Sequence, residues 1–338
     1  MEFQFLGTSS GTPSRSRNVS GLALHSPTSK GWVLVDCGEG TQHQILRTHL
    51  TLHGLQAIFI THMHGDHCYG LPGLLASAGM GNRTAPLAIV GPPPLWRLLQ
   101  AVMETSELAL PFALDFIAID DLPGHAAFCD FDVRATALSH RMPSWAYTFT
   151  ERDVERRLDP ERLRAAGVPR GEAWGRLQRG EDVVMQDGRL VRPADVLQTP
   201  RRPRRIVVGG DNDRPELLLD EARQADVLVH EATYTEAIRL KVGPGPQHSS
   251  ALMVGRMAQE AGLLHLVLTH FSPRYQERPG PGQPGIGDVE AEARSVYEGG
   301  LFMARDFDRY VLDKQYVLER LPSEERRRSD VASALQPT

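Results

Sequence analysis

Four side chains that can bind a metal stand close together in one short segment. His62, His64, Asp66 and His67 lie within six positions, although histidine accounts for only 13 of the 338 residues. Neutral imidazole and carboxylate together suit Zn, Mn or Fe. The spacing therefore predicts a metal site with hydrolytic chemistry. The alternative is a polar surface loop whose histidines fall together by coincidence.

The residues around this cluster indicate how it is held. An apolar run, Ala57-Ile58-Phe59-Ile60, precedes it, and turn-forming Gly65 and Gly70 lie within and after it. Such a pattern is typical of a short buried strand that ends in a loop. A strand end is a rigid place from which to orient metal ligands.

One loop cannot orient a complete hydrolytic centre, and the sequence offers further ligands after other apolar runs. His140 follows residues 133–139, Asp211 follows 206–210, and His270 follows 266–269. In α/β proteins the loops after such strands tend to gather at one edge of the sheet. His140 taken alone could equally be a core histidine, and Asp213 is a rival to Asp211.

Strand-like and helix-like runs alternate along most of the chain, which favours an α/β protein built of packed layers with helices outside. The predicted strands are 3–6, 32–36, 57–61, 87–90, 112–119, 145–150, 206–208, 227–230 and 264–269. The predicted helices are 41–50, 71–78, 94–105, 214–224, 249–261 and 289–297.

Composition and the distribution of apolar residues limit the class of protein. The chain is 41% hydrophobic and 23% charged, which is ordinary for a globular protein. No apolar run approaches the roughly 20 residues that span a bilayer, and the N-terminus lacks a signal-peptide pattern. Three widely spaced cysteines do not predict a disulfide framework. We expect a cytoplasmic protein without membrane contact.

Two segments depart from the regular pattern. Residues 151–205 carry 14 Arg against ten Asp plus Glu, with little apolar periodicity. A loop of this length is usually functional or disordered, and a mobile solvated loop is the plain interpretation. Residues 321–338 include a run of charged side chains and are predicted to be a disordered tail.

The ordered set of ligands resembles the metallo-β-lactamase superfamily. The resemblance implies an αββα sandwich with a two-metal centre at one edge. By that pattern His62, His64 and His140 hold one metal, Asp66, His67 and His270 hold the second, and Asp211 bridges them. Two such metals activate water and clamp the attacking and leaving oxygens of a phosphodiester. Asp66 is then the orienter or base for the attacking water.

Further motifs resemble tRNase Z, the endonuclease that removes 3′ trailers from precursor tRNA, in its short form. They are His230-Glu231-Ala232-Thr233, His248-Ser249-Ser250, Pro13-Ser14-Arg15-Ser16-Arg17-Asn18, the opening Phe5-Leu6-Gly7-Thr8-Ser9-Ser10-Gly11-Thr12-Pro13, His140-Arg141-x-Pro143-Ser144, and Leu268-Thr269-His270-Phe271-Ser272-Pro273-Arg274-Tyr275. The resemblance extends from residue 1 to about 320, with 151–205 in the place of the family's tRNA-binding arm. It implies a zinc-dependent endoribonuclease with two Zn²⁺ per chain, Mn²⁺ or another divalent metal being possible. It also implies a homodimer in which the arm of one subunit serves the active site of the other.

The resemblance assigns roles to residues outside the metal set. Glu231 would orient His248, and together they would protonate the departing 3′ oxygen, leaving a 3′-hydroxyl on the tRNA. The predicted RNA-binding residues are Arg15, Arg17, Arg170 and Arg176.

The chain departs from the family pattern at a few positions. Glu172 stands where the arm has proline, Asn212 replaces a threonine, and Ser250 replaces another. One alternative keeps the metal centre but makes the protein a small-molecule phosphodiesterase or arylsulfatase of the same superfamily. Another is a non-catalytic RNA-binding module, against which the complete ligand set argues.

Overall fold

The computed structural model describes residues 1–322 apart from 28, 153 and 155, and it divides the chain into two compact units. The larger unit comprises Met1–Thr150 and the chain from Arg204 onward, and the smaller comprises Glu151–Pro203. Most of the predicted tail, from residue 323 on, lies outside the described residues. Within the described part, no helix is both long and apolar enough to cross a membrane.

The larger unit contains two mixed sheets. The first has eight strands in the order β17-β16-β1-β2-β3-β4-β5-β6. β1 pairs antiparallel with β2 and β16, whereas β3, β4, β5 and β6 are parallel neighbours. Its strands are β1 (Glu2–Gly7), β2 (Gly21–His25), β3 (Trp32–Val35), β4 (Leu55–Phe59), β5 (Leu87–Gly91), β6 (Leu114–Ala118), β16 (Arg309–Leu312) and β17 (Leu318–Leu321).

The second sheet has seven strands in the order β15-β14-β13-β12-β9-β8-β7. β12, β13, β14 and β15 run parallel, and β9 pairs antiparallel with β12. Its strands are β7 (Ala126–Phe128), β8 (Phe131–Leu138), β9 (Ser144–Glu151), β12 (Arg205–Gly209), β13 (Val227–Glu231), β14 (His265–Thr269) and β15 (Gly300–Met303).

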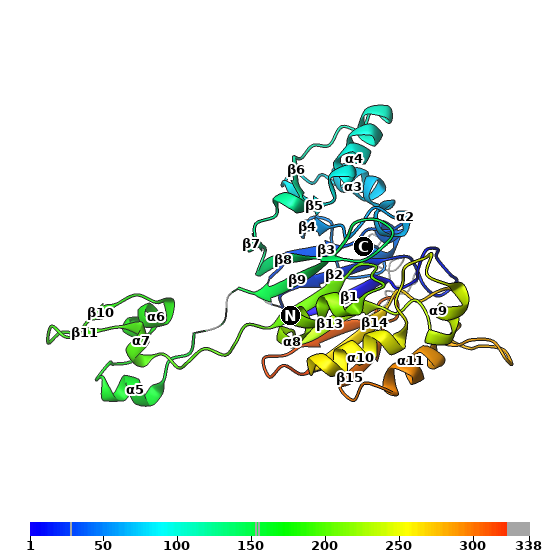
Figure 1. The fold of residues 1–338 in the computed structure, drawn as a ribbon. Helices are drawn as coiled ribbons and strands as arrows, with labels where there is room; N and C mark the ends of the chain where they lie inside the picture. The colour runs from blue at the N-terminus through cyan, green and yellow to red at the C-terminus, as the bar shows by residue number, and fades with distance from the viewer. Residues whose placement is uncertain (28, 153, 155, 323–338) are drawn as a thin grey trace, which may run out of the picture. The chain divides into compact units, whose positions relative to one another are not determined.

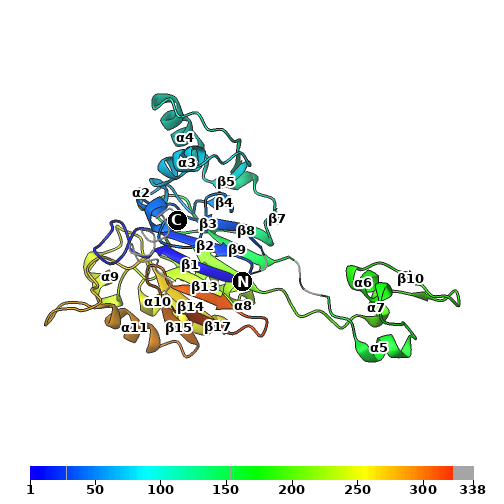
Figure 2. The ribbon, with the colours of Figure 1, turned by 180° about the vertical axis from the view of Figure 1, so that it is seen from behind.

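The two sheets pack face to face, with helices on the outer faces. In β4, Ala57 and Phe59 join the core between the sheets, while Ile58 and the residue after the strand, Ile60, pack under the helices on the other face. Both faces of the strand are therefore buried, which explains its continuous apolar run. Figures 1 and 2 show α3 and α4 on one side of the sheets and α10 and α11 on the other. The predicted αββα sandwich is confirmed.

The helices of the larger unit cover these outer faces or connect the strands. They are α1 (Thr41–Ile45), α2 (Gly65–Cys68), α3 (Leu71–Met80), α4 (Pro93–Thr105), η1 (Ile119–Asp121), η2 (Pro215–Leu218), α8 (Leu219–Gln224), α9 (Glu236–Val242), α10 (Ala251–Ala261) and α11 (Ile286–Arg294). Three predicted helices are shorter than expected, and one of them, 214–224, is divided into η2 and α8. α1 ends at Ile45 because the next amides bond three residues back, Arg47 to Gln44 and Thr48 to Ile45. α10 begins after Ser250, whose hydroxyl caps it by accepting from Met253.

The smaller unit has its own secondary structure, which the sequence did not predict. It contains α5 (Pro160–Ala165), α6 (Glu172–Arg179), the hairpin β10 (Val183–Val184) and β11 (Leu190–Val191), and α7 (Pro193–Val196). Its buried apolar side chains are Leu163, Val168, Leu177, Val183, Val191 and Val196. These residues are too unevenly spaced to produce one helical or strand period, so the small core was not visible in the sequence. Its surface carries the arginines, and we refer to Glu151–Pro203 as the arm.

Candidate metal centre

The predicted ligands converge at one edge of the two sheets. His62 follows β4, His140 follows β8, Asp211 follows β12 and His270 follows β14. His62, His64, His140 and Asp211 form one group of converging ligand atoms, and Asp66, His67 and His270 form a second. The loops after parallel strands meet at the same sheet edge, which is why residues so distant in sequence lie together.

In the first group three imidazoles turn their nitrogens toward one point. Nδ1 of His64 lies 3.0 Å from Nε2 of His62 and 3.1 Å from Nε2 of His140. The carboxylate of Asp211 closes the group, with Oδ2 3.6 Å from His62 and 3.7 Å from His140. A tetrahedral Zn²⁺ with nitrogen ligands at 2.0–2.1 Å places them about 3.3 Å apart, so this spacing fits one ion.

In the second group His67 and His270 face each other beside Asp66. Their Nε2 atoms are 3.2 Å apart, and Oδ2 of Asp66 lies 3.5 Å from His67 and 3.3 Å from His270. The other oxygen of Asp211, Oδ1, lies 3.4 Å from His67 and 3.3 Å from His270. Each oxygen of Asp211 therefore faces a different group.

The burial and hydrogen bonding of Asp211 test whether a metal fits here. Its side chain is buried, and Oδ1 has no hydrogen-bond partner among the described residues. A buried carboxylate oxygen without a donor is costly unless a cation satisfies it. Asp213, the rival from the sequence, belongs to neither ligand group. The donor set and the orphaned oxygen fit a cation between the two groups.

Electrostatics keep the acidic ligand ionised. Burial opposes ionisation of Asp66, but the charge of His67 and hydrogen bonds from His270 and His67 hold the pKa of Asp66 below its ordinary value. The same carboxylate accepts the backbone N–H of Gly11 at 2.7 Å. Asp66 is thus fixed as an acceptor at the rim of the centre.

A second acidic residue supports the ligands from behind, and the sequence did not identify it. Oδ2 of Asp36 lies 2.7 Å from Nδ1 of His67, which leaves Nε2 of His67 to face the metal groups. Asp36 also accepts from the amide and hydroxyl of Thr61. It directly follows β3 with φ of 60°, so a polar residue ending a buried strand was the available signal. His140 and His270 are held similarly, by the carbonyl of Gln247 and the hydroxyl of Thr233.

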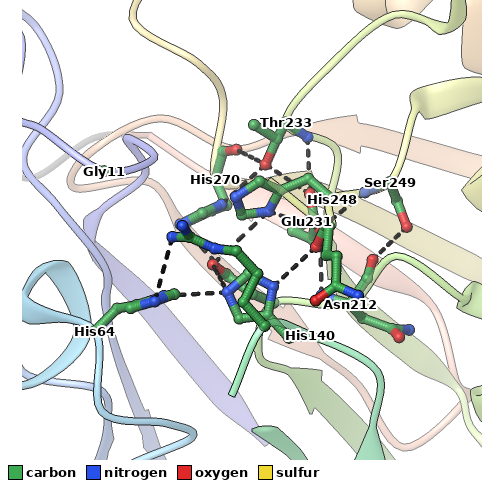
Figure 3. A network of polar contacts seen from close by, with 12 residues as sticks. Gly11, His64, His140, Asn212, Glu231, Thr233, His248, Ser249 and His270 are labelled. Carbon is green, nitrogen blue, oxygen red and sulfur yellow. Dashed lines mark hydrogen bonds and ion pairs between the residues drawn. The ribbon is translucent and has the colours of Figure 1, made fainter. Parts of the chain in front are cut away.

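Glu231 is the hub of a buried polar network next to the ligands (Figure 3). Its Oε1 accepts from the amides of Asn212 and Ser249 and lies 3.1 Å from Nδ1 of His248. Its Oε2 accepts from the amide and hydroxyl of Thr233. Burial would raise the pKa of Glu231, but the charge and hydrogen bond of His248 lower it to about 2.

His248 stands between this network and the metal groups, with Nδ1 also 3.7 Å from Oδ2 of Asp211. Burial would lower the pKa of His248, but the charges of Glu231 and Asp211 raise it to about 9. The neighbouring His230 is fully buried and is held by the backbone carbonyl of Glu231 and the side-chain amide of Asn212. Of the two histidines beside Glu231, only His248 faces the centre.

A cavity of about 420 Å³ opens onto the centre. Its walls include Asp66, His248, Arg141 and Tyr69. The guanidinium of Arg141 lies 3.3 Å from Nε2 of His64, the ring nitrogen that faces away from the other ligands. The cavity thus presents charged, polar and aromatic side chains to a substrate that reaches the centre.

The predicted RNA-binding arginines differ in exposure. Arg17 is 5% exposed and donates to Thr8, Ala304 and Glu277, so it is committed to contacts within the protein. Arg15, in contrast, is exposed. In the arm, Arg170 is exposed and lies over the ring of Trp174, whereas Arg176 pairs with Glu181. Arg15 and Arg170 are therefore exposed, Arg176 is partly exposed beside Glu181, and Arg17 is buried.

Similarity to known proteins extends over nearly the whole chain. Ribonuclease Z of Marinobacter nauticus is 54% identical over 321 residues, covering 95% of this chain and 99% of that protein. The chain belongs to the ribonuclease Z family. Ribonuclease Z of Pseudomonas putida strain GB-1 is 49% identical over 94% of the chain, and that of Brevibacillus brevis is 40% identical over 87%. These cover 99% and 91% of the two relatives.

Solved structures agree with this membership in the ribonuclease Z family. Human tRNase Z, short form, superimposes with a TM-score of 0.62 at 25% identity, covering 93% of this chain and all of that one. A metallo-β-lactamase fold protein from Bacillus subtilis, 19% identical, has a TM-score of 0.60 over 90% of this chain and 96% of its own, and supports the fold alone. A family described as anti-Pycsar protein Apyc1 matches residues 1–150 only. That segment lacks Asp211 and His270, so it does not contain the whole centre.

Proposed function

We infer that this member of the ribonuclease Z family is a metal-dependent endoribonuclease that removes 3′ trailers from precursor tRNA. The observation that carries the inference is near-full-length similarity to ribonuclease Z, at 54% identity, together with a converged His/Asp centre. Hydrolysis beside the last base of the tRNA body would leave a 3′-hydroxyl on the tRNA. We also propose that the protein acts in the cytoplasm, which precursor tRNA as its substrate supports.

The seven ligands supply the centre of the proposed reaction. We propose two Zn²⁺ ions, one held by His62, His64 and His140 and the other by Asp66, His67 and His270, with Asp211 shared between them. Bound metals would supply a lowered pKa for water and a clamp on the phosphate oxygens. The opposed faces of the Asp211 carboxylate and its orphaned oxygen support this arrangement.

Three side chains of the chain handle protons in this proposal. Asp66, held ionised and hydrogen-bonded to Gly11, is the proposed orienter or base for the attacking water. His248 carries a proton at neutral pH because Glu231 and Asp211 raise its pKa to about 9. His248 then donates that proton to the departing 3′ oxygen, while Glu231 fixes its tautomer and orientation.

In this proposal the arm supplies contacts that bind tRNA to the enzyme. Contacts to the phosphate backbone supply much of RNA affinity and make it salt-dependent. Exposed Arg170, stacked beside Trp174, is the first candidate for such a contact. Replacing residues 152–203 by a short Gly-Ser linker should abolish cleavage of precursor tRNA, while a small phosphodiester such as bis(p-nitrophenyl) phosphate is still turned over.

The direct test uses purified protein and a precursor tRNA with a 3′ extension. We expect trimming to a single 3′ end, loss of trimming on removal of metal, recovery with Zn²⁺, and loss in Asp66→Ala. Metal-dependent turnover of a small phosphodiester without any trimming would instead establish the small-molecule phosphodiesterase.

We further propose a homodimer in which the arm of one subunit serves the centre of the other. The family resemblance supports it, and subunit mixing tests it. Chains without the arm and Asp66→Ala chains are each inactive on precursor tRNA. If the arm acts across the dimer, an equal mixture recovers about a quarter of the wild-type sites, because half the dimers are mixed and each has one complete site. A mixture that stays inactive contradicts the proposal that the arm of one subunit serves the centre of the other. A monomer in sedimentation velocity contradicts the dimer.

A further inference from the structure

Tyr69 stands out because its ring is exposed at the mouth of the centre. It is 66% exposed, and it is the only aromatic residue among the large apolar side chains that are exposed in the described part of the chain. An aromatic ring gains free energy from burial, so one left open at a substrate cavity is available for contact.

The local backbone holds the ring in this place. Tyr69 follows α2, and its amide donates to the carbonyl of Gly65 at 2.9 Å. A Cβ added to Gly65 would lie 2.3 Å from the tyrosine ring, so only glycine allows the ring to lie against the ligand loop. Asp66 is the next residue after Gly65 and lines the same cavity as the ring. The aromatic face is therefore close to where the substrate phosphate must lie.

Arg141 supplies a charge in the same cavity. His64 turns Nδ1 toward the other ligands, and a neutral imidazole that offers Nδ1 to a metal carries its proton on Nε2. Nε2 then donates and cannot accept from Arg141, whose guanidinium lies 3.3 Å away. The guanidinium is left to bind another acceptor at the mouth, and a phosphate oxygen is the acceptor that matches its geometry.

An aromatic face and a guanidinium in one cavity match the two parts of a nucleotide. We propose that Tyr69 stacks on the base of a nucleotide next to the scissile phosphate, while Arg141 contacts that nucleotide's phosphate. This inference rests on the proposed function and narrows its substrate to one with a nucleobase at this position. A base stacked on an aromatic side chain contributes about 1–3 kcal/mol, which corresponds to a change of about 5- to 150-fold in Kd.

The test measures RNA affinity without cleavage. In an Asp66→Ala background, Tyr69→Ala should raise the Kd for precursor tRNA by about 5- to 150-fold, whereas Tyr69→Phe and Tyr69→Trp, which keep the ring, should stay within about threefold. Tyr69→Leu should behave like alanine. Met80→Ala is the matched control, because Met80 is 87% exposed and does not line this cavity.

A structural role for Tyr69 would give a different pattern. If the ring only orders the ligand loop, RNA lacking a base at either nucleotide beside the cleavage point would lose the same affinity in wild-type and Tyr69→Ala backgrounds. If Tyr69 stacks on one of these two bases, the RNA that lacks this base binds the wild-type and Tyr69→Ala backgrounds with equal affinity. The loss caused by removing the base and the loss caused by removing the ring then do not add.

Three outcomes overturn the inference. Additive losses at both positions, or equal losses in Tyr69→Phe and Tyr69→Ala, refute stacking while leaving precursor cleavage by the wild type as evidence for the proposed function. If the wild type does not cleave precursor tRNA at all, the proposed function fails and the inference falls with it.

Discussion

Glu231→Gln removes a charge from the buried network while keeping the size of the side chain. The lost charge is the first of the two that hold the pKa of His248 at about 9, against an ordinary value of 6.5. That difference corresponds to about 3 kcal/mol. Since burial favours the neutral imidazole, the pKa of His248 in the variant should fall to about 6.5 or below.

The size of the effect depends on pH in a way that identifies its cause. At pH 8 the protonated fraction of His248 falls from about 0.9 to about 0.03, so the single-turnover rate constant on precursor tRNA should fall about 30-fold. At pH 6 both forms are largely protonated and this part of the loss disappears. The assay is single-turnover trimming of precursor tRNA between pH 6 and 8.5, with Zn²⁺ held constant.

A substrate whose leaving group needs no proton is the matched control. With bis(p-nitrophenyl) phosphate, the ratio of wild-type to variant rates should not change with pH. A lower fraction of folded protein cannot imitate the result, because it lowers both substrates alike. The reasoning is refuted if the variant loses the same factor on RNA at pH 6 and pH 8, or if the small phosphodiester shows the same pH-dependent loss.

Three further changes test other parts of the structure. Asp36→Asn removes the carboxylate behind His67 and should weaken metal affinity by about 10- to 100-fold, measured by competition with a chelating dye; unchanged affinity contradicts its supporting role. Arg17→Ala should lower the free energy of unfolding by about 2–4 kcal/mol, because it breaks a buried network, whereas Arg15→Ala should leave stability within about 0.5 kcal/mol and weaken RNA binding. If urea unfolding shows a loss of stability for Arg15→Ala and none for Arg17→Ala, the structural role of Arg17 is contradicted. Burial raises the pKa of Asp306 from 3.8 to about 6, so the folded protein holds this proton more tightly and loses stability as pH rises through 6. Asp306→Asn should therefore reduce the stability difference between pH 4 and pH 8 by about 2–3 kcal/mol, and identical pH dependence in the two proteins would contradict this.

Local sequence patterns predicted the layers of the fold because both faces of the central strands are buried. The run ending at Ile60 and the runs before Asp211 and His270 are apolar throughout, and each proved to be a strand between the opposite sheet and a covering helix. β16 and β17, which are only partly buried, were not predicted, and β2 was also missed although it is buried. Their pairing with distant segments, Phe3 with Tyr310 for example, supplies the stability that their own sequence does not indicate.

The arm shows the same limit on a smaller scale. Its six buried apolar residues come from three helices, a hairpin and the connection between α5 and α6, so no single period relates them. Because charged residues dominate the sequence of the arm, the sequence pattern predicted a loop. The structure instead has a small core with the arginines outside it.

The sequence by itself determined the ligand types and their order along the chain, because dense His/Asp spacing after apolar runs is a local signal. Only the tertiary structure decided which residues act together. Asp211 rather than Asp213 faces both ligand groups, Asp36 supports His67 from another strand, and Arg17 is buried rather than open to solvent. These distinctions depend on the direction of side chains at a shared sheet edge, and contacts between residues tens to hundreds of positions apart leave no period in the sequence.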